Sequence, residues 1–213
     1  MRSVSVKNES GLFVLNILAV LIVQGILQAA AWQGKINEKD SASQIAEKAG
    51  RKEPIMKHIT LYDSPVGILR IVTEDSALTD LALDCDEPPV TGEYSREETP
   101  LTRRVRSQLD EYFSGQRTDF DLPLKPKGTE FQKKDWAALQ EIPYGQTRTY
   151  KDIAEAIGCP KGFRAVGLAN NRNPIMIIIP CHRVIGSDGS LTGYAGGTHI
   201  KKYLLELEGV KVD

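Results

Sequence analysis

A cysteine followed directly by a histidine and an arginine is the part of this 213-residue chain best suited to chemistry. The run Ile177–Ile179 predicts a short buried strand, which Pro180 ends, and Cys181, His182 and Arg183 follow. A thiol beside groups that take its proton or hold its negative charge is a candidate nucleophile. A buried structural cysteine beside a surface His-Arg pair fits these residues equally well, because free cysteine is among the most buried residue types.

The other cysteines and histidines indicate no second site. Cys85 follows a predicted strand among acidic residues, where a thiolate is disfavoured, so we interpret it as structural or incidental. Cys159 lies in a turn, and we interpret it as a small packing residue. Three cysteines without a C-x-x-C pair predict neither a disulfide framework nor a thiolate zinc site. The histidines form no H-x-x-x-H pair. We therefore expect no metal and no cofactor.

The composition, 41% hydrophobic and 26% charged, is typical of a soluble globular protein. The net charge of −1 is unevenly distributed. Residues 1–55 carry +2 (7 basic, 5 acidic), residues 56–126 carry −6 (8 and 14), and residues 127–213 carry +3 (12 and 9). The basic last third is compatible with a polyanionic partner, but a charge of +3 is weak support on its own.

Residues 12–32 are mostly apolar, and as a helix they would be about 31 Å long, enough to cross a bilayer. Three interpretations stay open: a membrane anchor, a signal peptide cleaved after the A-x-A match at residues 29–31, and an extension with no role in the fold. If the segment spans a membrane, the five basic residues that follow it, against two before it, place the rest of the chain in the cytoplasm.

The body of the protein is expected to begin near Met56. Alternating strands at about 57–62, 68–73 and 78–83, separated by turn residues, predict an antiparallel meander. A helix follows over Thr99–Phe113, because Leu101, Val105, Leu109 and Tyr112 share one face. The extended residues 121–126 then link to a second domain.

The last third is predicted to be helical. One amphipathic helix spans about 131–142, and Thr149 caps a short helix with Asp152 three residues on. A second short helix, about 162–170, completes a helix-turn-helix. A final helix spans about 198–208 and is expected to pack through four residues: Ile200, Tyr203, Leu204 and Leu207.

Eight motifs in this region occur in an order that resembles the O6-alkylguanine-DNA alkyltransferase family, also called methylated-DNA–protein-cysteine methyltransferases. The resemblance is dense over residues 128–209, looser over 56–126 and absent over 1–55. The motifs are Phe131-Gln132 with Trp136, Ile142-Pro143-x-Gly145-x-Thr147, Tyr150 with Ile153-Ala154, Arg164-Ala165-Val166-Gly167, Asn173-Pro174, Ile179–Val184, Gly193-Tyr194-x-Gly196-Gly197 and Leu204-Leu205-x-x-Glu208-Gly209.

The resemblance implies an α+β protein in two domains. Residues 56–126 would form a small antiparallel sheet with a helix, ribonuclease-H-like, and residues 127–213 a winged helix-turn-helix-like domain that binds DNA and carries the catalytic cysteine. The protein would move an alkyl group from O6 of guanine in double-stranded DNA irreversibly to Cys181, once per molecule, with O4 of thymine as a further candidate substrate. We expect a cytoplasmic monomer, with residues 12–32 at most a tether to the inner face of the membrane.

The resemblance also implies roles for catalytic residues. His182 takes the proton of Cys181 through a water, Glu208 orients and charges His182, and the hydroxyl of Tyr150 donates to the guanine ring. Because an ordinary thiol of pKa about 8.5 is only a few per cent thiolate at neutral pH, we expect the site to lower the pKa of Cys181. Glu208 also ends a helix, where the macrodipole disfavours an acid unless a partner holds it.

The remaining roles concern DNA and the alkyl pocket. By resemblance, Arg164 fills the gap left by the extruded nucleotide. The small residues beside it, Ala165 and Gly167, let the helix backbone approach DNA, and Thr149 is a further candidate contact. Asn173 joins the recognition helix to the active-site loop, and five residues form the pocket and its lid: Val184, Tyr194, Ala195, Gly196 and Gly197. Residues 161–163 depart from the family pattern, where small or basic residues are more usual.

Three other classes compete with this interpretation. Relatives that bind alkylated DNA without transfer lack the cysteine that is present here. A regulator would need a further domain, for which residues 1–55 are too short and apolar. A Cys-His hydrolase would turn over repeatedly and would need an oxyanion hole and no helix-turn-helix.

Overall fold

The computed structural model describes residues 56–84 and 93–212, which belong to one compact unit. The predictions made for residues 12–32 and for Cys85 lie outside the described residues. Within the described part of the chain, none of the helices combines the length and apolar character that a membrane crossing requires.

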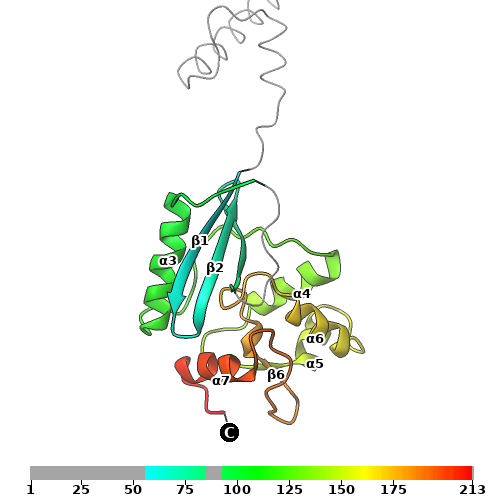
Figure 1. Ribbon diagram of the computed structural model, residues 1–213. Coiled ribbons are helices and arrows are strands. Elements are labelled where there is room, and N and C mark those ends of the chain that lie inside the picture. Colours follow the sequence, from blue (N-terminus) through cyan, green and yellow to red (C-terminus); the bar gives the residue numbers. More distant parts are fainter. Residues whose placement is uncertain (1–55, 85–92, 213) are drawn as a thin grey trace, which may run out of the picture. The chain divides into compact units, whose positions relative to one another are not determined.

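The first part of the body is a four-stranded sheet with the order β3-β2-β1-β4 (Figure 1). The predicted meander is confirmed: β1 (Lys57–Ser64), β2 (Gly67–Glu74) and β3 (Ala77–Leu83) pair antiparallel. The sequence did not predict β4 (Tyr94–Ser95), which pairs parallel with β1. A strand of two residues inside a polar segment carries no alternation by which it could be found.

Helix α3 (Pro100–Phe113) lies across one face of this sheet (Figure 1). Thr99 starts the helix by accepting a hydrogen bond from the backbone of Thr102, as the predicted boundary requires. Its buried face carries Val105, Leu109 and Tyr112, which belong to the same hydrophobic cluster as the sheet residues. The predicted helix and its apolar face are therefore confirmed.

Three helices of the second part match the predicted pattern: α4 (Glu130–Gln140), α5 (Tyr150–Ala156) and α6 (Phe163–Asn171). Thr129 and Thr149 each form a capping box at the start of α4 and α5. Helices α5 and α6 pack on each other across a short turn, which is the expected helix-turn-helix.

The last helix, α7 (Thr198–Leu207), differs from its prediction in the face that it buries. Tyr203 was expected to pack but is 37% exposed, whereas Leu205 is fully buried. Lys201 is also fully buried, on the same face as Leu204 and Leu205. The buried face of α7 therefore includes a lysine, which the predicted apolar face did not contain. The polar partners that allow its burial are described with the site below.

Strand β3 lies at the edge of the sheet and carries two segments of the second part of the chain. Leu78 exchanges backbone hydrogen bonds with Pro123 and Lys125, at 2.8 Å each. Leu81 donates its backbone N–H to the carbonyl of Pro174 (2.8 Å) and accepts from Met176 (2.9 Å). The edge of the sheet thus fixes the segment that leads to the cysteine, and one hydrophobic cluster runs through both parts.

The strand predicted over residues 177–179 is wrong, because the chain there folds into tight turns. Ile177 has φ 72°, and the N–H of Ile178 donates to the carbonyl of Met176 at 2.8 Å, which closes a three-residue turn. This conformation is rare for a β-branched residue, and such strain clusters at functional sites. The apolar run was correctly expected to be buried, but burial alone does not distinguish a strand from a buried turn.

The cysteine itself lies in a single 3-10 turn, η1 (Cys181–Arg183), followed by β6 (Val184–Ile185). Strand β6 pairs with β5 (Arg148–Thr149), which directly precedes α5. This short parallel pair joins the cysteine turn to the start of the helix-turn-helix.

Candidate active site

Asn173 holds the turn that presents the cysteine. Its Oδ1 accepts from the backbone N–H of Ile175 at 3.0 Å, and its Nδ2 donates to the carbonyl of Ile179 at 2.7 Å. The same Nδ2 lies 3.2 Å from Sγ of Cys181. Asn173 therefore braces both ends of the strained turn and also places a hydrogen-bond donor against the sulfur.

Glu208 is the centre of a buried polar network at the end of α7. Arg183 donates to both carboxylate oxygens, from Nε at 2.9 Å and from its second terminal nitrogen at 3.0 Å. Tyr112 donates through its hydroxyl at 2.8 Å, and the backbone N–H of Gly145 at 3.2 Å. His182 completes the set, with Nε2 at 2.8 Å from Oε1. The acid is thus held by specific partners, as its place at a helix end requires.

These partners fix the charge of Glu208. Burial alone would raise the pKa of its carboxyl, but the hydrogen bonds from His182 and Arg183 outweigh burial and lower that pKa to about 2. The carboxylate is therefore ionised at any physiological pH and offers only acceptors. A bidentate arginine on a carboxylate is among the strongest of such arrangements.

The ionised carboxylate determines the tautomer of His182. Burial lowers the pKa of this histidine, so the ring is neutral at pH 7 and carries one N–H. That N–H belongs on Nε2, because Nε2 faces an acceptor. Nδ1 then carries the lone pair, and among the described residues it has no hydrogen-bond partner. His182 follows Cys181 in the chain, and its Nδ1 is therefore the atom that is free to accept a proton.

The expectation of a lowered cysteine pKa is wrong for the unbound chain. Burial raises the pKa of Cys181 to about 11, although the hydrogen bond from Asn173 and the charge of Lys201 act in the opposite direction. Cys181 is only 7% exposed. The sulfur is therefore a thiol at rest, and a base must remove its proton when it reacts.

Lys201 is a site residue that the sequence reasoning did not identify. Its Nζ donates to the carbonyls of Val184 and Thr192 and lies 5.7 Å from the centroid of the Tyr150 ring. Burial lowers the pKa of Lys201 to about 8, while Cys181 acts to raise it. The signal was present in the sequence as a lysine beside Ile200 on the apolar face of α7.

A cavity of about 310 Å³ opens onto the cysteine. Among the candidate pocket residues, it is lined by Asn173, Tyr194, Ala195 and Gly196 together with Cys181. The hydroxyl of Tyr194 is buried and has no partner among the described residues. β3 contributes Asp80, Ala82 and Leu83 to the same wall.

Val184 is placed differently from Tyr194, Ala195 and Gly196. It is fully buried and pairs with Arg148 between β6 and β5, and it is not part of the cavity wall. Its backbone carbonyl, which accepts from Lys201, is the part of Val184 that takes part in the polar arrangement of the site.

Tyr150, at the start of α5, connects the helix-turn-helix with the loop over the cavity. Its hydroxyl donates to the carbonyl of Thr192 at 2.7 Å, and its pKa is raised by burial. Gly193 follows with φ 66°, and a Cβ there would lie 3.3 Å from the Tyr150 hydroxyl. The loop backbone therefore approaches the tyrosine closely, in a conformation that glycine favours.

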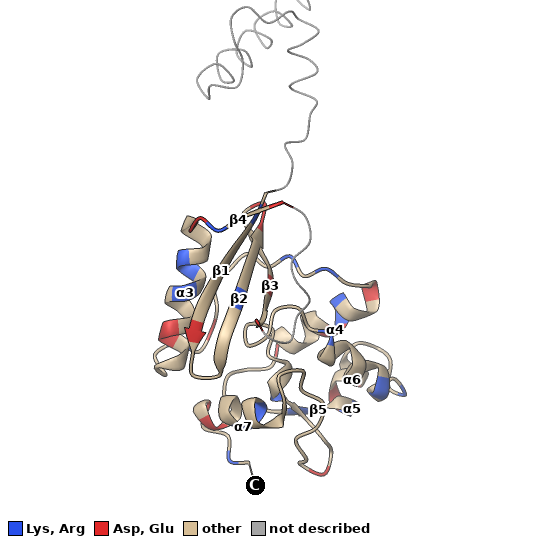
Figure 2. Cartoon of the chain, viewed as in Figure 1, with Lys and Arg blue, Asp and Glu red and all other residues tan. Residues whose placement is uncertain are grey.

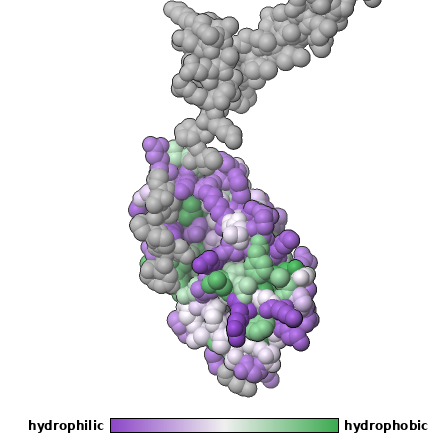
Figure 3. Space-filling model, turned by 90° about the vertical axis from the view of Figure 1, so that its right-hand side faces the viewer, coloured by the Kyte–Doolittle hydropathy of each residue, from purple (hydrophilic) through white to green (hydrophobic). Residues whose placement is uncertain are grey.

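The candidate DNA-binding residues lie on the helix-turn-helix. Arg164 and Ala165 are exposed in the first turn of α6, whereas Gly167 is half-buried and faces the Tyr150 ring. The side-chain oxygen of Thr149 accepts from the backbone of Asp152, so its structural role is a helix cap. Figure 2 shows basic residues on α4 and α6, and Figure 3, which views the side on which these helices lie, shows apolar surface bordered by hydrophilic residues.

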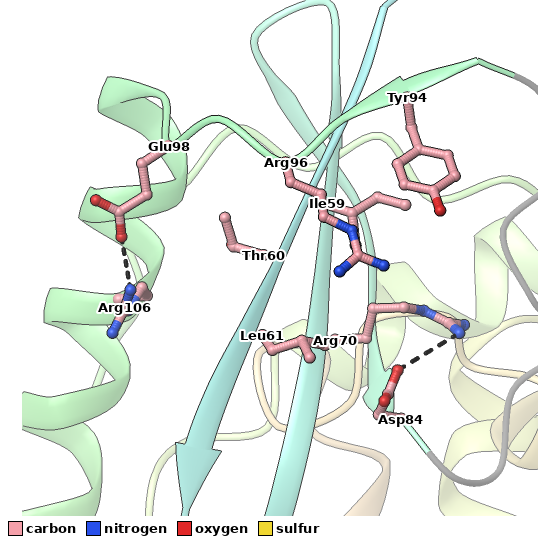
Figure 4. Close-up of a pocket in the computed structure, with 9 residues that line it drawn as sticks. All are labelled: Ile59, Thr60, Leu61, Arg70, Asp84, Tyr94, Arg96, Glu98 and Arg106. Carbon is pink, nitrogen blue, oxygen red and sulfur yellow. Dashed lines mark hydrogen bonds and ion pairs between the residues drawn. The ribbon is translucent and has the colours of Figure 1, made fainter.

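A second cavity, of about 470 Å³, lies over the sheet at β1, β2 and β4 (Figure 4). Two of its arginines are paired: Arg106 with Glu98 at 2.6 Å, and Arg70 with Asp84 at 4.0 Å. Cys181 does not line this cavity. Over residues 56–84 and 93–212, no three His, Cys, Asp or Glu side chains gather in a way that could hold a metal ion.

Comparison with known proteins identifies this arrangement. The profile of the 6-O-methylguanine DNA methyltransferase ribonuclease-like domain matches residues 57–126, and that of the DNA binding domain of the same family matches residues 130–210. A ribonuclease-like sheet thus precedes a helical DNA-binding domain. This domain carries Cys181, followed directly in the chain by His182, whose side chain can accept a proton. The chain belongs to the O6-methylguanine DNA methyltransferase family.

Individual relatives support the same family assignment. The chain is 49% identical over 153 residues to a methylated-DNA–protein-cysteine methyltransferase of Methanosarcina acetivorans, covering 71% of this chain and 98% of the relative. It is 47% identical over 160 residues to the constitutive enzyme of that name from Bacillus subtilis, covering 73% and 97%. Among solved structures, Mycobacterium tuberculosis O6-methylguanine methyltransferase is similar at TM-score 0.66 and 46% identity, covering 72% of this chain and 93% of that one. A structure of the Mycobacterium tuberculosis protein in complex with DNA is similar at TM-score 0.66 and 45% identity, covering 72% and 92%.

Proposed function

We propose that Cys181 is the acceptor in the reaction of this family. The chain repairs alkylated guanine in DNA by transferring the alkyl group to its own cysteine. The observation that carries the assignment to Cys181 is its position: the thiol lines a cavity of about 310 Å³ and follows directly on the brace formed by Asn173. Cys159, by contrast, is exposed in the turn between α5 and α6.

The proton of the thiol goes to His182 in this proposal. Nδ1 of His182 carries the free lone pair, and one water molecule between Sγ and Nδ1 relays the proton. The imidazolium that results faces the Glu208 carboxylate through Nε2, which stabilises its charge. The thiolate of Cys181 then attacks the alkyl carbon and the bond from that carbon to O6 breaks. Guanine leaves as an anion with the electron pair of that bond and takes a proton from water, while His182 gives the proton of the thiol back to water, so the protons balance.

Tyr150 donates a hydrogen bond to the departing guanine in this proposal, and Lys201 makes the change of partner possible. The Tyr150 hydroxyl, which donates to Thr192 in the unbound chain, turns to donate to the guanine ring. The carbonyl of Thr192 does not lose its last partner in that step, because Lys201 also donates to it at 2.9 Å. The second donor therefore keeps this carbonyl hydrogen-bonded while the Tyr150 hydroxyl changes partner.

DNA binds along the helix-turn-helix in this proposal. Arg164 enters the base stack in place of the extruded nucleotide, while Ala165 and Gly167 allow the backbone of α6 close to the duplex. Thr149, at the start of α5, contacts the DNA backbone through its hydroxyl. Exchange of Arg164 for alanine should slow repair of duplex DNA much more than repair of a single strand, in which no base has to leave a duplex.

Mass spectrometry tests the acceptor. After incubation with a duplex oligonucleotide that carries one O6-methylguanine, peptide mapping should find one methyl group per chain, on Cys181. The Cys181→Ser variant should take up none, and the Cys159→Ser variant should react like the wild type. A methyl group on Cys85 or Cys159, or repair of more than one lesion per chain, would refute the assignment.

We further propose that the protein acts as a cytoplasmic monomer, with residues 12–32 at most a tether to the inner face of the membrane. Its substrate is cytoplasmic DNA, and an acceptor thiol has to stay reduced, which exported compartments do not favour. Both family matches lie after residue 56. A chain beginning at Met56 should therefore repair O6-methylguanine at the full-length rate. Cell fractionation tests the location, and mature protein outside the cytoplasm, cut after Ala31, would refute it.

A further inference from the structure

Phe163, the first residue of α6, lies beside a residue with a proposed role in DNA binding. Phe163 is 47% exposed, although a large aromatic side chain is normally buried. Its ring lies beside Arg164, whose guanidinium carbon is 5.9 Å from the ring centroid. That distance is within the range of a cation–π interaction.

Arg164 has little else to hold it. Among the described residues, no hydrogen bond or ion pair to its side chain is present, and the first turn of α6 contains no acidic residue. As the second residue of the helix, Arg164 also lies at the positive end of the helix dipole, where a cation is disfavoured. The electron-rich face of the Phe163 ring therefore supplies the local stabilisation that the helix itself does not provide.

The turn before α6 fixes the position of this pair. Gly162 caps the helix without a side-chain hydrogen bond, and a Cβ at this position would lie 2.9 Å from the carbonyl oxygen of Cys159. The backbone is thus closely packed immediately before Phe163. The ring also lines a cavity of about 510 Å³ whose wall includes Lys151 and Lys161 together with one acid, Asp188.

We propose that Phe163 is a positioning residue for base extrusion, which holds the guanidinium of Arg164 extended toward DNA. This inference rests on the proposed role of Arg164 as the residue that replaces the extruded nucleotide. An arginine already held in place loses less conformational freedom when it enters the duplex. Phe163 therefore acts through Arg164 and not on the methyl transfer at Cys181.

The experiment is a double-mutant cycle on repair of a duplex oligonucleotide with one O6-methylguanine. Phe163→Ala and Phe163→Leu should slow duplex repair by about two- to fivefold, as expected for an exposed cation–π interaction, and Phe163→Tyr should retain the wild-type rate. Rates on a single-stranded oligonucleotide with the same lesion should not change. Tyr94→Ala, which removes an exposed aromatic residue of the sheet, is the matched control.

The decisive comparison uses the Arg164→Ala background, in which Phe163→Ala should have no further effect because the residue through which it acts is gone. Additive losses in the cycle, or a Phe163→Leu variant as fast as the wild type, would overturn the inference. Equal losses on duplex and single-stranded DNA would also overturn it, since they indicate damage to the fold. If Arg164→Ala causes no duplex-specific loss, the proposed role of Arg164 itself fails, which is a separate result.

Discussion

Nδ2 of Asn173 lies 3.2 Å from Sγ of Cys181, and the same nitrogen donates to the carbonyl of Ile179 at 2.7 Å. One side chain therefore supports the nucleophile and the strained turn before it. The donor lowers the pKa of Cys181 against the stronger effect of burial, because it stabilises the negative sulfur that forms during the reaction.

The first prediction concerns this brace. Asn173→Ala removes three hydrogen bonds, so we expect methyl transfer to slow by at least about tenfold and the melting temperature to fall by several degrees. Asn173→Asp keeps the acceptor for the N–H of Ile175 but places a negative charge beside the sulfur. It should therefore transfer even more slowly than Asn173→Ala, and its second carboxylate oxygen would face the carbonyl oxygen of Ile179 with no donor between them. Single-turnover rates and thermal melts measure the two effects, and an Asn173→Asp variant that transfers faster than Asn173→Ala would contradict the role of the donor.

Much of the fold could be predicted because local signals and tertiary structure agree. The capping boxes at Thr129 and Thr149 and the periodic face of α3 determine those helices with little help from distant residues. The strand predicted over residues 177–179 was wrong for a physical reason. Their backbone follows the hydrogen bonds of Asn173 and the edge of β3, which are separate in sequence, and not the β propensity of isoleucine.

In the candidate site, too, some residues could be named from the sequence and others could not. Cys181, His182 and Glu208 could be named as candidates from the sequence because family motifs contain them, and the structure places His182 against Glu208. The parts that act through long-range contacts could not be assigned: Tyr112 reaches Glu208 across 96 residues of chain, and Lys201 reaches the carbonyl of Val184. The raised pKa of Cys181 was equally hidden, since it depends on burial that only the folded chain creates.

The second prediction concerns acid stability. The pKa of Glu208 is lowered in the folded chain to about 2, so its contribution is present above the unfolded pKa of about 4.5 and is lost as pH falls toward 2. The shift corresponds to about 3 kcal/mol. Glu208→Gln leaves the buried guanidinium of Arg183 without its counter-charge and should be less stable at pH 6 by about that amount.

Urea unfolding between pH 2 and pH 6 measures this contribution. The difference between the wild type and Glu208→Gln should shrink steadily as the pH falls. Glu206→Gln, which changes an exposed acid two residues earlier, is the control and should leave the profile unchanged. A difference between the wild type and Glu208→Gln that does not vary with pH would argue against an ionised Glu208 held by charge.

The third prediction concerns Asp135, a fully buried acid in the middle of α4. Burial raises its pKa to about 7. The amide of Asn170, with its nitrogen turned toward Asp135, donates to Oδ2 at 2.7 Å, and this hydrogen bond acts in the opposite direction. Oδ1 has no partner in the described part of the chain. Because the folded pKa lies above the unfolded value, ionisation of Asp135 works against the fold, and stability should decrease as pH rises from about 4 to about 7.

Asp135→Asn removes this titration and should be more stable than the wild type at pH 7.5, by up to about 4 kcal/mol, with no advantage near pH 4. Urea unfolding of both proteins across that range gives the difference in the free energy of unfolding. The effect has the opposite sign to that of Glu208, so the two variants control for each other. An advantage of Asp135→Asn that is equally large at pH 4 would show that side-chain packing, and not charge, is responsible.

The last prediction concerns Lys201, whose charge lowers the pKa of Cys181 while its Nζ donates to the carbonyls of Val184 and Thr192. Lys201→Met keeps the apolar stem of the side chain but removes both donors and the charge. We expect methyl transfer at pH 7 to slow by at least about tenfold, which is typical when a charge-assisted hydrogen bond is lost. Lys202→Met, which removes the neighbouring exposed lysine, is the matched control and should react like the wild type.

Because burial lowers the pKa of Lys201 to about 8, the unbound wild type loses this charge as pH rises through 8. The ratio of wild-type to Lys201→Met rates, measured in single turnovers from pH 6.5 to 9.5, should therefore be largest below pH 8 and fall above it, whereas a ratio near one at every pH would show that Lys201 only fills space under the loop.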